Sequence, residues 1–190
     1  MKASNELLKS LNEDLAAEWG TITRYTYQSA KALGLRGAEL REIFQKEIPD
    51  ELRHASYLTD VISDFGGEPT TQPRAWDRTT DLKTMVEQDL KLELHDVDNY
   101  KRHAKMAEEE GLIELKVRLE EMASDESRHA RELNRILRGL EPTRESSFEG
   151  KENYGQNIEH HEHQQTHTRR NRPARLRHFR GTRPSARTRD

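Results

Sequence analysis

One six-residue motif occurs twice in the chain, and its two copies lie 75 residues apart. Residues 50–55 read Asp-Glu-Leu-Arg-His-Ala, and residues 125–130 read Asp-Glu-Ser-Arg-His-Ala. Each copy contains Glu-x-x-His, and residues three positions apart on a helix lie on the same face, about one turn from each other. A Glu oxygen and a His nitrogen placed in this way can bind the same metal ion. The chain is therefore expected to fold with two helical metal-binding pairs.

The similarity between the two copies extends well beyond the motif. Comparison of residues 14–65 with residues 89–140 gives 13 identities among 52 positions, which indicates an internal repeat. The repeat includes Glu18 and Glu93, each of which lies 33 residues before the Glu of its own motif. The sequence therefore predicts two similar halves, each with one isolated Glu and one Glu-x-x-His pair. Other identities include the pairs Asp14/Asp89 and Tyr25/Tyr100.

Apolar residues recur at alternating steps of three and four, which is the pattern of one buried helix face. The pattern covers residues 5–33, 38–65, 81–111 and 112–138. Six polar residues occupy positions on these faces where core residues belong: Glu18, Glu51, His54, Glu93, Glu126 and His129. We therefore predict an all-α fold, a four-helix bundle over residues 1–140, with the six polar side chains at matching levels in its core.

The connections between the predicted helices determine their directions. Gly34 and Gly37 make a short link that favours an antiparallel neighbour. Residues 66–80 lack a helical period. About 15 extended residues reach about 50 Å, which exceeds the length of a 28-residue helix, about 42 Å. This connector can return along the whole bundle. Two antiparallel hairpins joined by a long crossover follow, and a distortion is expected at Pro49 within the second helix.

Four carboxylates in one apolar core would repel one another and lose their hydration, which raises their pKa values and destabilises the fold. Two divalent cations remove this problem. The repeat assigns Glu18 and His54 to one metal ion, Glu93 and His129 to the other, and Glu51 and Glu126 to bridging positions. Carboxylates combined with imidazoles suit iron or manganese. The sequence thus predicts two iron ions per chain, with manganese as an alternative.

The cysteine count and the hydropathy of the chain exclude several classes of site and of protein. The chain has no cysteine, which excludes disulfides, zinc-thiolate sites and iron–sulfur clusters. No apolar run approaches membrane-spanning length, and the N-terminal residues lack the apolar core of a signal peptide. A cytoplasmic protein without membrane contact is expected.

Residues 141–190 differ in composition from the predicted bundle. Residues 166–190 contain nine Arg and one acid, so residues 1–165 hold 23 basic and 34 acidic residues and a net charge of -11. We predict that residues 141–190 form a disordered tail rich in His and Arg. Its positive charge could contact DNA phosphates without sequence preference. A solvated extension without a partner is the simpler alternative.

The arrangement of one Glu per outer helix and two Glu-x-x-His motifs resembles the ferritin-like di-iron carboxylate superfamily, and bacterioferritins most closely, over residues 5–140. The resemblance implies a ferroxidase centre made of the six polar residues, where Fe(II) is oxidised by O₂ or H₂O₂ for iron storage and detoxification. It also implies a homo-oligomer. Tyr25 matches a family tyrosine beside the centre that hydrogen-bonds a ligand or supplies an electron; alternatively, Tyr25 and Tyr100 are simply core aromatics with satisfied hydroxyls.

Two features depart from the bacterioferritin pattern. The Met that binds haem in that family is replaced here by Leu52, so haem is not expected. A fifth helix after the bundle is expected in proteins that build full shells, and residues 141–165 are too polar to predict one, which leaves the size of the shell open.

The same ligands leave other functions open. The alternatives are a dimanganese catalase or rubrerythrin-like peroxidase, and a DNA-protecting protein that uses its basic tail as Dps-type mini-ferritins do. Glu47 faces the helix seam one turn before Glu51, but its repeat equivalent is Met122, so it is an asymmetric extra carboxylate. His95 and His103 lack the Glu spacing and are expected at the surface.

Overall fold

The computed structural model describes residues 2–140, and these residues form four helices and no strand. The helices are α1 (Asn5–Lys31), α2 (Gly34–Asp64), α3 (Leu82–Glu109) and α4 (Ile113–Leu140). The predicted all-α class is confirmed. The division into a bundle over 1–140 and a tail over 141–190 stays a prediction, because the tail lies outside the described residues.

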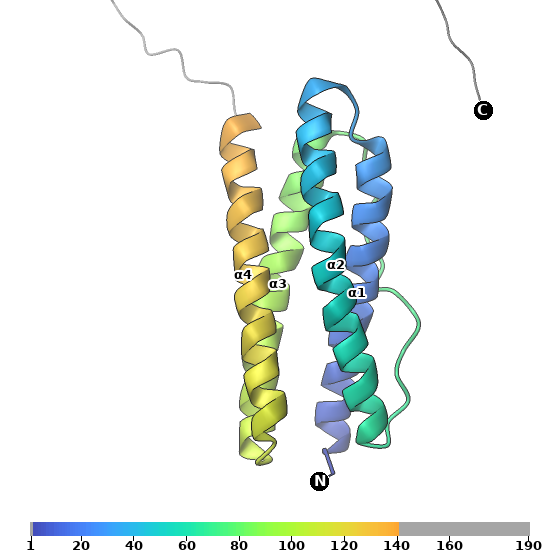
Figure 1. The fold of residues 1–190 in the computed structure, drawn as a ribbon, viewed down its shortest axis with the longest axis vertical. Helices are drawn as coiled ribbons and strands as arrows, with labels where there is room; N and C mark the ends of the chain where they lie inside the picture. Colours follow the sequence, from blue (N-terminus) through green and yellow to red (C-terminus); the bar gives the residue numbers. More distant parts are fainter. Residues whose placement is uncertain (1, 141–190) are drawn as a thin grey trace, which may run out of the picture. The chain divides into compact units, whose positions relative to one another are not determined.

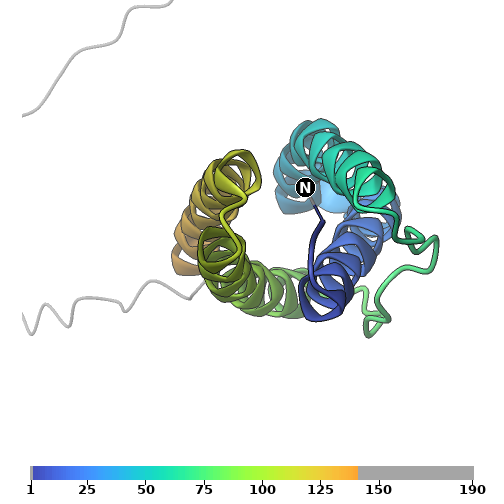
Figure 2. The ribbon, with the colours of Figure 1, turned by 90° about the horizontal axis from the view of Figure 1, so that it is seen from below.

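The four helices form two antiparallel hairpins, α1 with α2 and α3 with α4 (Figure 1). The connector after α2 runs back along the bundle, so α2 and α3 point in the same direction, as predicted (Figure 1). Seen along the bundle, the helices surround a common axis (Figure 2). Side chains on the inner faces of all four helices therefore point toward one central region.

The ends of the helices follow local sequence signals. The Ser4 hydroxyl caps α1 by accepting from the Leu7 amide at 3.1 Å, and Asp81 caps α3 by accepting from the Thr84 amide at 2.8 Å. Helix α2 begins at Gly34, four residues earlier than predicted, because Gly34 adopts a φ of 78° that reverses the chain at once. The α2 helix then continues through Pro49 without a break.

The long connector between α2 and α3 is held against α1 by hydrogen bonds. The backbone of Thr70 bonds to the side chains of Trp19 and Asn12 at 3.2 and 2.7 Å. The Arg74 amide donates to the Ala16 carbonyl at 2.6 Å. The connector therefore has a fixed path along the bundle despite its lack of helix.

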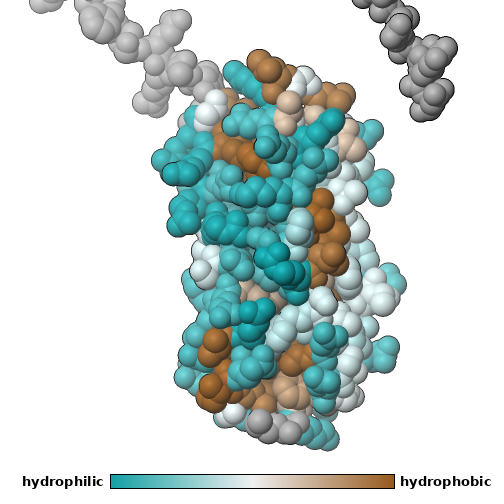
Figure 3. Space-filling view, in the orientation of Figure 1, coloured by the Kyte–Doolittle hydropathy of each residue, from teal (hydrophilic) through white to brown (hydrophobic). Residues whose placement is uncertain are grey.

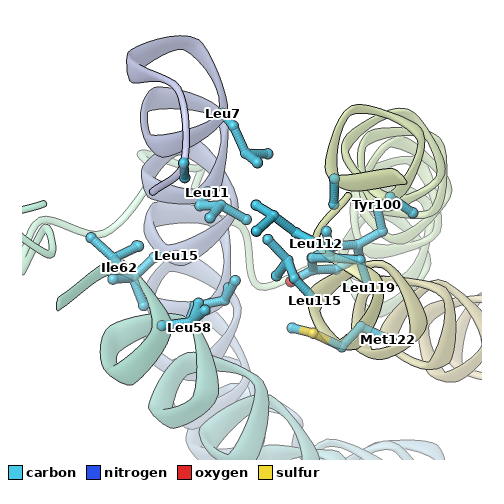
Figure 4. Close-up of a cluster of buried hydrophobic side chains, with 14 of the residues drawn as sticks. Leu7, Leu11, Leu15, Leu58, Ile62, Tyr100, Leu112, Leu115, Leu119 and Met122 are labelled. Atoms are coloured by element: carbon cyan, nitrogen blue, oxygen red, sulfur yellow. The ribbon is translucent and has the colours of Figure 1, made fainter. Parts of the chain in front are cut away.

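Two apolar clusters fill the bundle, and the six predicted ligands lie between them. The first cluster includes Leu7, Leu11, Leu15, Leu58, Leu119 and Met122, whose side chains point toward one another in Figure 4. The second includes Tyr25, Leu40, Phe44, Val86 and Leu133. Along every helix the polar positions fall between residues of the two clusters, so each cluster closes one end of a buried polar layer.

The face of the molecule drawn in Figure 3 is dominated by hydrophilic residues, with apolar side chains in separate small areas. Large apolar side chains exposed on residues 2–140 include Leu33, Leu35, Leu52 and Leu94. None of the described helices is both long enough and apolar enough to cross a membrane.

Candidate metal centre

The six polar residues expected in the core are all buried, and each is at most 4% exposed. All four helices contribute to the group: α1 gives Glu18, α2 gives Glu51 and His54, α3 gives Glu93, and α4 gives Glu126 and His129. The structure thus brings together residues that are up to 111 positions apart in the chain.

The ligand atoms of these residues form two overlapping groups, each within 4.8 Å. The first group combines Glu18, Glu51, His54 and Glu126, and the second combines Glu51, Glu93, Glu126 and His129. Glu51 and Glu126 belong to both. The two groups share the residues that the repeat assigned to bridging positions, and the role of these residues as metal ligands stays a prediction.

Both histidines turn their Nδ1 atoms toward the centre. His54 Nδ1 lies 3.0 Å from Glu126 Oε1. His129 Nδ1 lies 3.1 Å from Glu51 Oε1 and 3.1 Å from Glu126 Oε2. Each Nδ1 is therefore placed among carboxylate oxygens where it can bind a metal ion together with them.

The outer nitrogens of the same histidines face carboxylates that fix the rings. His54 Nε2 lies 3.3 Å from Asp125 Oδ2, and His129 Nε2 lies 2.5 Å from Glu47 Oε2. A carboxylate at Nε2 favours the proton on that atom and leaves the Nδ1 lone pair for a metal ion. Glu47, predicted as an extra carboxylate on the seam, is buried and lies behind His129, outside the two groups of ligand atoms.

Two tyrosines bind Glu18 and Glu93, which each belong to only one of the two groups and are called the terminal carboxylates below. The Tyr25 hydroxyl donates to Glu93 Oε1 at 2.5 Å, and the Tyr100 hydroxyl donates to Glu18 Oε1. Burial, together with the charge of the accepting carboxylate, raises the pKa of both phenols well above the ordinary value. Both tyrosines therefore stay protonated and act as donors beside the centre.

Several atoms of the centre have no hydrogen-bond partner among residues 2–140. These buried atoms are Glu18 Oε2, Glu51 Oε1, Glu126 Oε1 and His54 Nδ1. Leaving a buried acceptor unpaired is costly, and a cation supplies the missing interaction. Carboxylate oxygens with imidazole nitrogens are a donor set that iron and manganese accept, so the residues present fit a pair of such ions.

The acid–base properties of the centre show how strongly its charges interact. Burial raises the pKa of Glu18, and burial with a neighbouring carboxylate raises the pKa of Glu51 and Glu126 well above the ordinary value. Burial alone would lower the pKa of His54, but the neighbouring carboxylates of Glu126 and Glu18 raise it to about 11. The centre therefore holds protons in the absence of metal.

A buried arginine next to the centre was missed by the sequence reasoning. Arg24 is 1% exposed; its Nε lies 2.8 Å from Asp89 Oδ1 and its Nη2 lies 3.2 Å from Glu93 Oε1. Burial raises the pKa of Glu93, but the neighbouring His129 and Glu126 and the charge of Arg24 bring it down to about 2. The repeat could not reveal Arg24, because its equivalent position holds Asn99.

The prediction that His103 lies at the surface is wrong, whereas His95 is exposed as expected. His103 is 1% exposed, and its Nδ1 lies 2.6 Å from Asp14 Oδ2. The repeat-related pair is Gln28 and Asp89, joined at 3.0 Å. Asp14 and Asp89 occupy equivalent positions of the repeat, one helical turn before Glu18 and Glu93. This identity was the sequence signal that each buried aspartate needs a polar partner on the neighbouring helix.

Comparison with known proteins gives matches over the bundle. A family model for the ferritin-like domain matches residues 8–142. Bacterioferritin from Mycobacterium leprae is 31% identical over 130 residues, which are 68% of this chain and 82% of that protein. Bacterioferritin from Streptomyces coelicolor is 30% identical over 150 residues, or 78% of this chain and 89% of that protein.

Solved structures give the same result. Ferritin-like, diiron-carboxylate proteins from Bacillus anthracis match with a TM-score of 0.68 and 37% identity, over 70% of this chain and 95% of that chain. The bacterioferritin of Desulfovibrio desulfuricans, whose structure describes a diiron site in different catalytic states, matches with a TM-score of 0.66 and 26% identity, over 71% and 80%.

Proposed function

This chain belongs to the ferritin-like domain family, and from that premise we propose that it is a ferroxidase that oxidises Fe(II) to Fe(III) at a di-iron centre inside the bundle. The observation that carries the proposal is the pair of overlapping ligand groups that share Glu51 and Glu126. Shared carboxylates hold two metal ions close together, which suits a reaction that removes one electron from each.

Each residue of the centre has a distinct part in the proposal. Glu18 and His54 hold one ion, Glu93 and His129 hold the other, and Glu51 and Glu126 bridge them. Two bound ferrous ions together supply two electrons, which with two protons convert O₂ to H₂O₂ or H₂O₂ to two water molecules. Tyr25 and Tyr100 orient the terminal carboxylates, and the apolar clusters on either side keep bulk water away from the layer.

The relatives support iron as the metal and storage as the purpose. The Desulfovibrio desulfuricans bacterioferritin has a diiron site, and the Bacillus anthracis structure is described as diiron-carboxylate. By extension, the chain works as a homo-oligomer that stores and detoxifies iron in the cytoplasm. Leu52, 51% exposed on α2, replaces the haem-binding Met, and the absence of haem stays a prediction.

The experiment that tests the proposal is aerobic oxidation of Fe(II) by the full chain, followed by the ferric absorbance. The wild-type protein is expected to oxidise Fe(II) rapidly. The double variant Glu51→Ala, Glu126→Ala is expected to oxidise Fe(II) no faster than buffer without protein. The matched control is Glu39→Ala with Glu114→Ala, which removes two exposed, repeat-related carboxylates from the same helices. Equal rates in the wild-type protein and the Glu51/Glu126 variant would refute the proposal.

Continued oxidation far beyond two irons per chain indicates storage, whereas oxidation that stops at two indicates a dinuclear enzyme. The second outcome favours a dimanganese catalase or rubrerythrin-like peroxidase, which peroxide turnover with manganese would then test.

The proposed contact of the basic tail with DNA lies outside the described residues. Truncation at Pro142 tests it, and the expected result is loss of DNA retention with unchanged iron oxidation.

A further inference from the structure

We propose that Arg24 makes the two halves of the metal centre unequal, so that the first divalent cation binds at Glu18 and His54 and the second at Glu93 and His129. These pairs are named the first and second subsites. The inference rests on the proposed dinuclear centre and goes beyond it, because the ligands themselves are related by the repeat and would by themselves bind two ions equally.

Arg24 contacts a ligand of the second subsite directly. Its Nη2 lies 3.2 Å from Glu93 Oε1, the same oxygen that accepts from Tyr25 at 2.5 Å. Two donors therefore occupy one oxygen of this carboxylate, one of them a permanent cation. A metal ion at the second subsite must bind the remaining oxygen while facing a positive charge in a buried environment.

The first subsite has no such cation among the described residues. The position equivalent to Arg24 holds Asn99, whose side-chain oxygen accepts from Arg102 at 2.9 Å and does not reach Glu18. Glu18 accepts a hydrogen bond from Tyr100, and its Oε2 has no partner within residues 2–140. His54 Nδ1, which belongs to the same subsite, lies 3.6 Å from Glu18 Oε1. One oxygen of Glu18 is thus ready to bind a cation without competition.

The acidic partner of Arg24 does not cancel this difference. Asp89 lies beside Arg24, but its repeat equivalent Asp14 lies in the other half and is equally buried. Asp14 faces His103 Nδ1, while His103 Nε2 lies 3.3 Å from the Arg102 guanidinium, an obligate donor. Among residues 2–140 no arginine or lysine pairs with Asp14 or Glu18, so the buried guanidinium of Arg24 has no counterpart around the first subsite.

The charges behind the histidines do not reverse this difference. His129 Nε2 lies 2.5 Å from Glu47 Oε2 and 3.9 Å from Asp50 Oδ2. Arg128 pairs with both carboxylates, at 3.3 Å and 2.6 Å, so their negative charge is offset. Behind the first subsite, His54 Nε2 lies 3.3 Å from Asp125 Oδ2. Each histidine therefore has a carboxylate behind it, and the buried charge of Arg24 remains the difference between the two subsites.

The test is anaerobic titration of the metal-free full chain with Co²⁺, which is not oxidised under these conditions. The wild-type protein is expected to bind in two steps whose constants differ by about tenfold or more, since a buried charge near a ligand acts over a short distance in a medium of low dielectric constant. Anomalous scattering from crystals holding one equivalent of Co²⁺ is expected to place the ion at Glu18 and His54.

The repeat supplies the matched variants. Arg24→Asn, which copies the residue at the equivalent position, is expected to strengthen the weaker step and bring the two constants within about threefold, and Arg24→Lys is expected to keep the gap because it keeps the charge. Arg131→Asn, the loss of an exposed arginine on α4, is expected to change neither step. If Arg24→Asn does not fold, Arg24→Gln serves as the second variant, because glutamine can still donate hydrogen bonds to Asp89 and Glu93 but carries no charge.

Equal steps in the wild-type protein, or a gap unchanged in the variants without Arg24, would overturn the role of Arg24 while leaving the dinuclear centre intact. Binding of fewer than two Co²⁺ ions per chain would overturn the centre itself and this inference with it.

Discussion

Tyr25 on α1 donates to Glu93 on α3, and its repeat equivalent Tyr100 on α3 donates to Glu18 on α1. Each hydroxyl crosses the same helix pair in the opposite direction, so each terminal carboxylate is fixed by the other half of the repeat. The two tyrosines are thus positioned to set the orientation of the ligands and not only to fill the core.

The replacement of each tyrosine by phenylalanine tests this role. Tyr25→Phe and Tyr100→Phe are each expected to slow Fe(II) oxidation by about tenfold, because loss of a partner that orients a ligand weakens metal binding and activity by this order. The initial rate of ferric absorbance measures the effect. Tyr57→Phe removes a hydroxyl that bonds only to the exposed Glu114 and serves as the control; equal losses in all three variants would contradict the role.

Binding of metal to the centre is expected to release protons. In the metal-free protein the pKa of His54 is about 11, and the pKa values of Glu51 and Glu126 are raised, so these groups hold protons near pH 7. Metal ions bind the deprotonated forms, so affinity should rise as pH rises. Calorimetric titration with Co²⁺ in buffers of different ionisation enthalpy measures the number released, and identical heats in all buffers would contradict it.

Glutamine at the bridging positions is expected to stabilise the metal-free protein. Glu126→Gln and Glu51→Gln each remove a buried carboxyl that must gain a proton on folding, and a gain of about 1–2 kcal/mol in the free energy of unfolding at pH 7 is expected. A group whose folded-state pKa is raised favours folding fully below its unfolded pKa and loses that contribution as pH rises through the folded pKa. The gain should therefore be larger at pH 7 than at pH 5.

Denaturant unfolding in the presence of a chelator measures this gain, with Glu39→Gln as the exposed control. A lower free energy of unfolding in the glutamine variants would contradict this prediction. It would show that the metal-free protein stabilises the carboxylates of Glu51 and Glu126, although both are buried and each has one oxygen without a hydrogen-bond partner.

The sequence predicted that six polar side chains meet in the core, as they do in the structure, because two independent patterns coincide at these residues. The helical period places Glu18 and Glu93 on buried faces, and the repeat relates them to the Glu-x-x-His pairs. Arg24 and His103 escaped prediction because their partners, Asp89 and Asp14, lie on another helix, and the period does not show which charged residues meet across α1 and α3. The sequence predicted the start of α2 four residues too late, because glycine normally disfavours a helix. In the structure Gly34 forms the turn between α1 and α2 and is also the first residue of α2.

The measurement that tests the central claim most directly is the number of Fe²⁺ ions bound by the metal-free full chain under anaerobic conditions. The overlapping ligand groups predict two tightly bound ions per chain, and both should be lost in the double variant Glu51→Ala, Glu126→Ala while the Glu39→Ala, Glu114→Ala control keeps them. One ion per chain, or two that persist without the bridging carboxylates, would contradict the dinuclear centre.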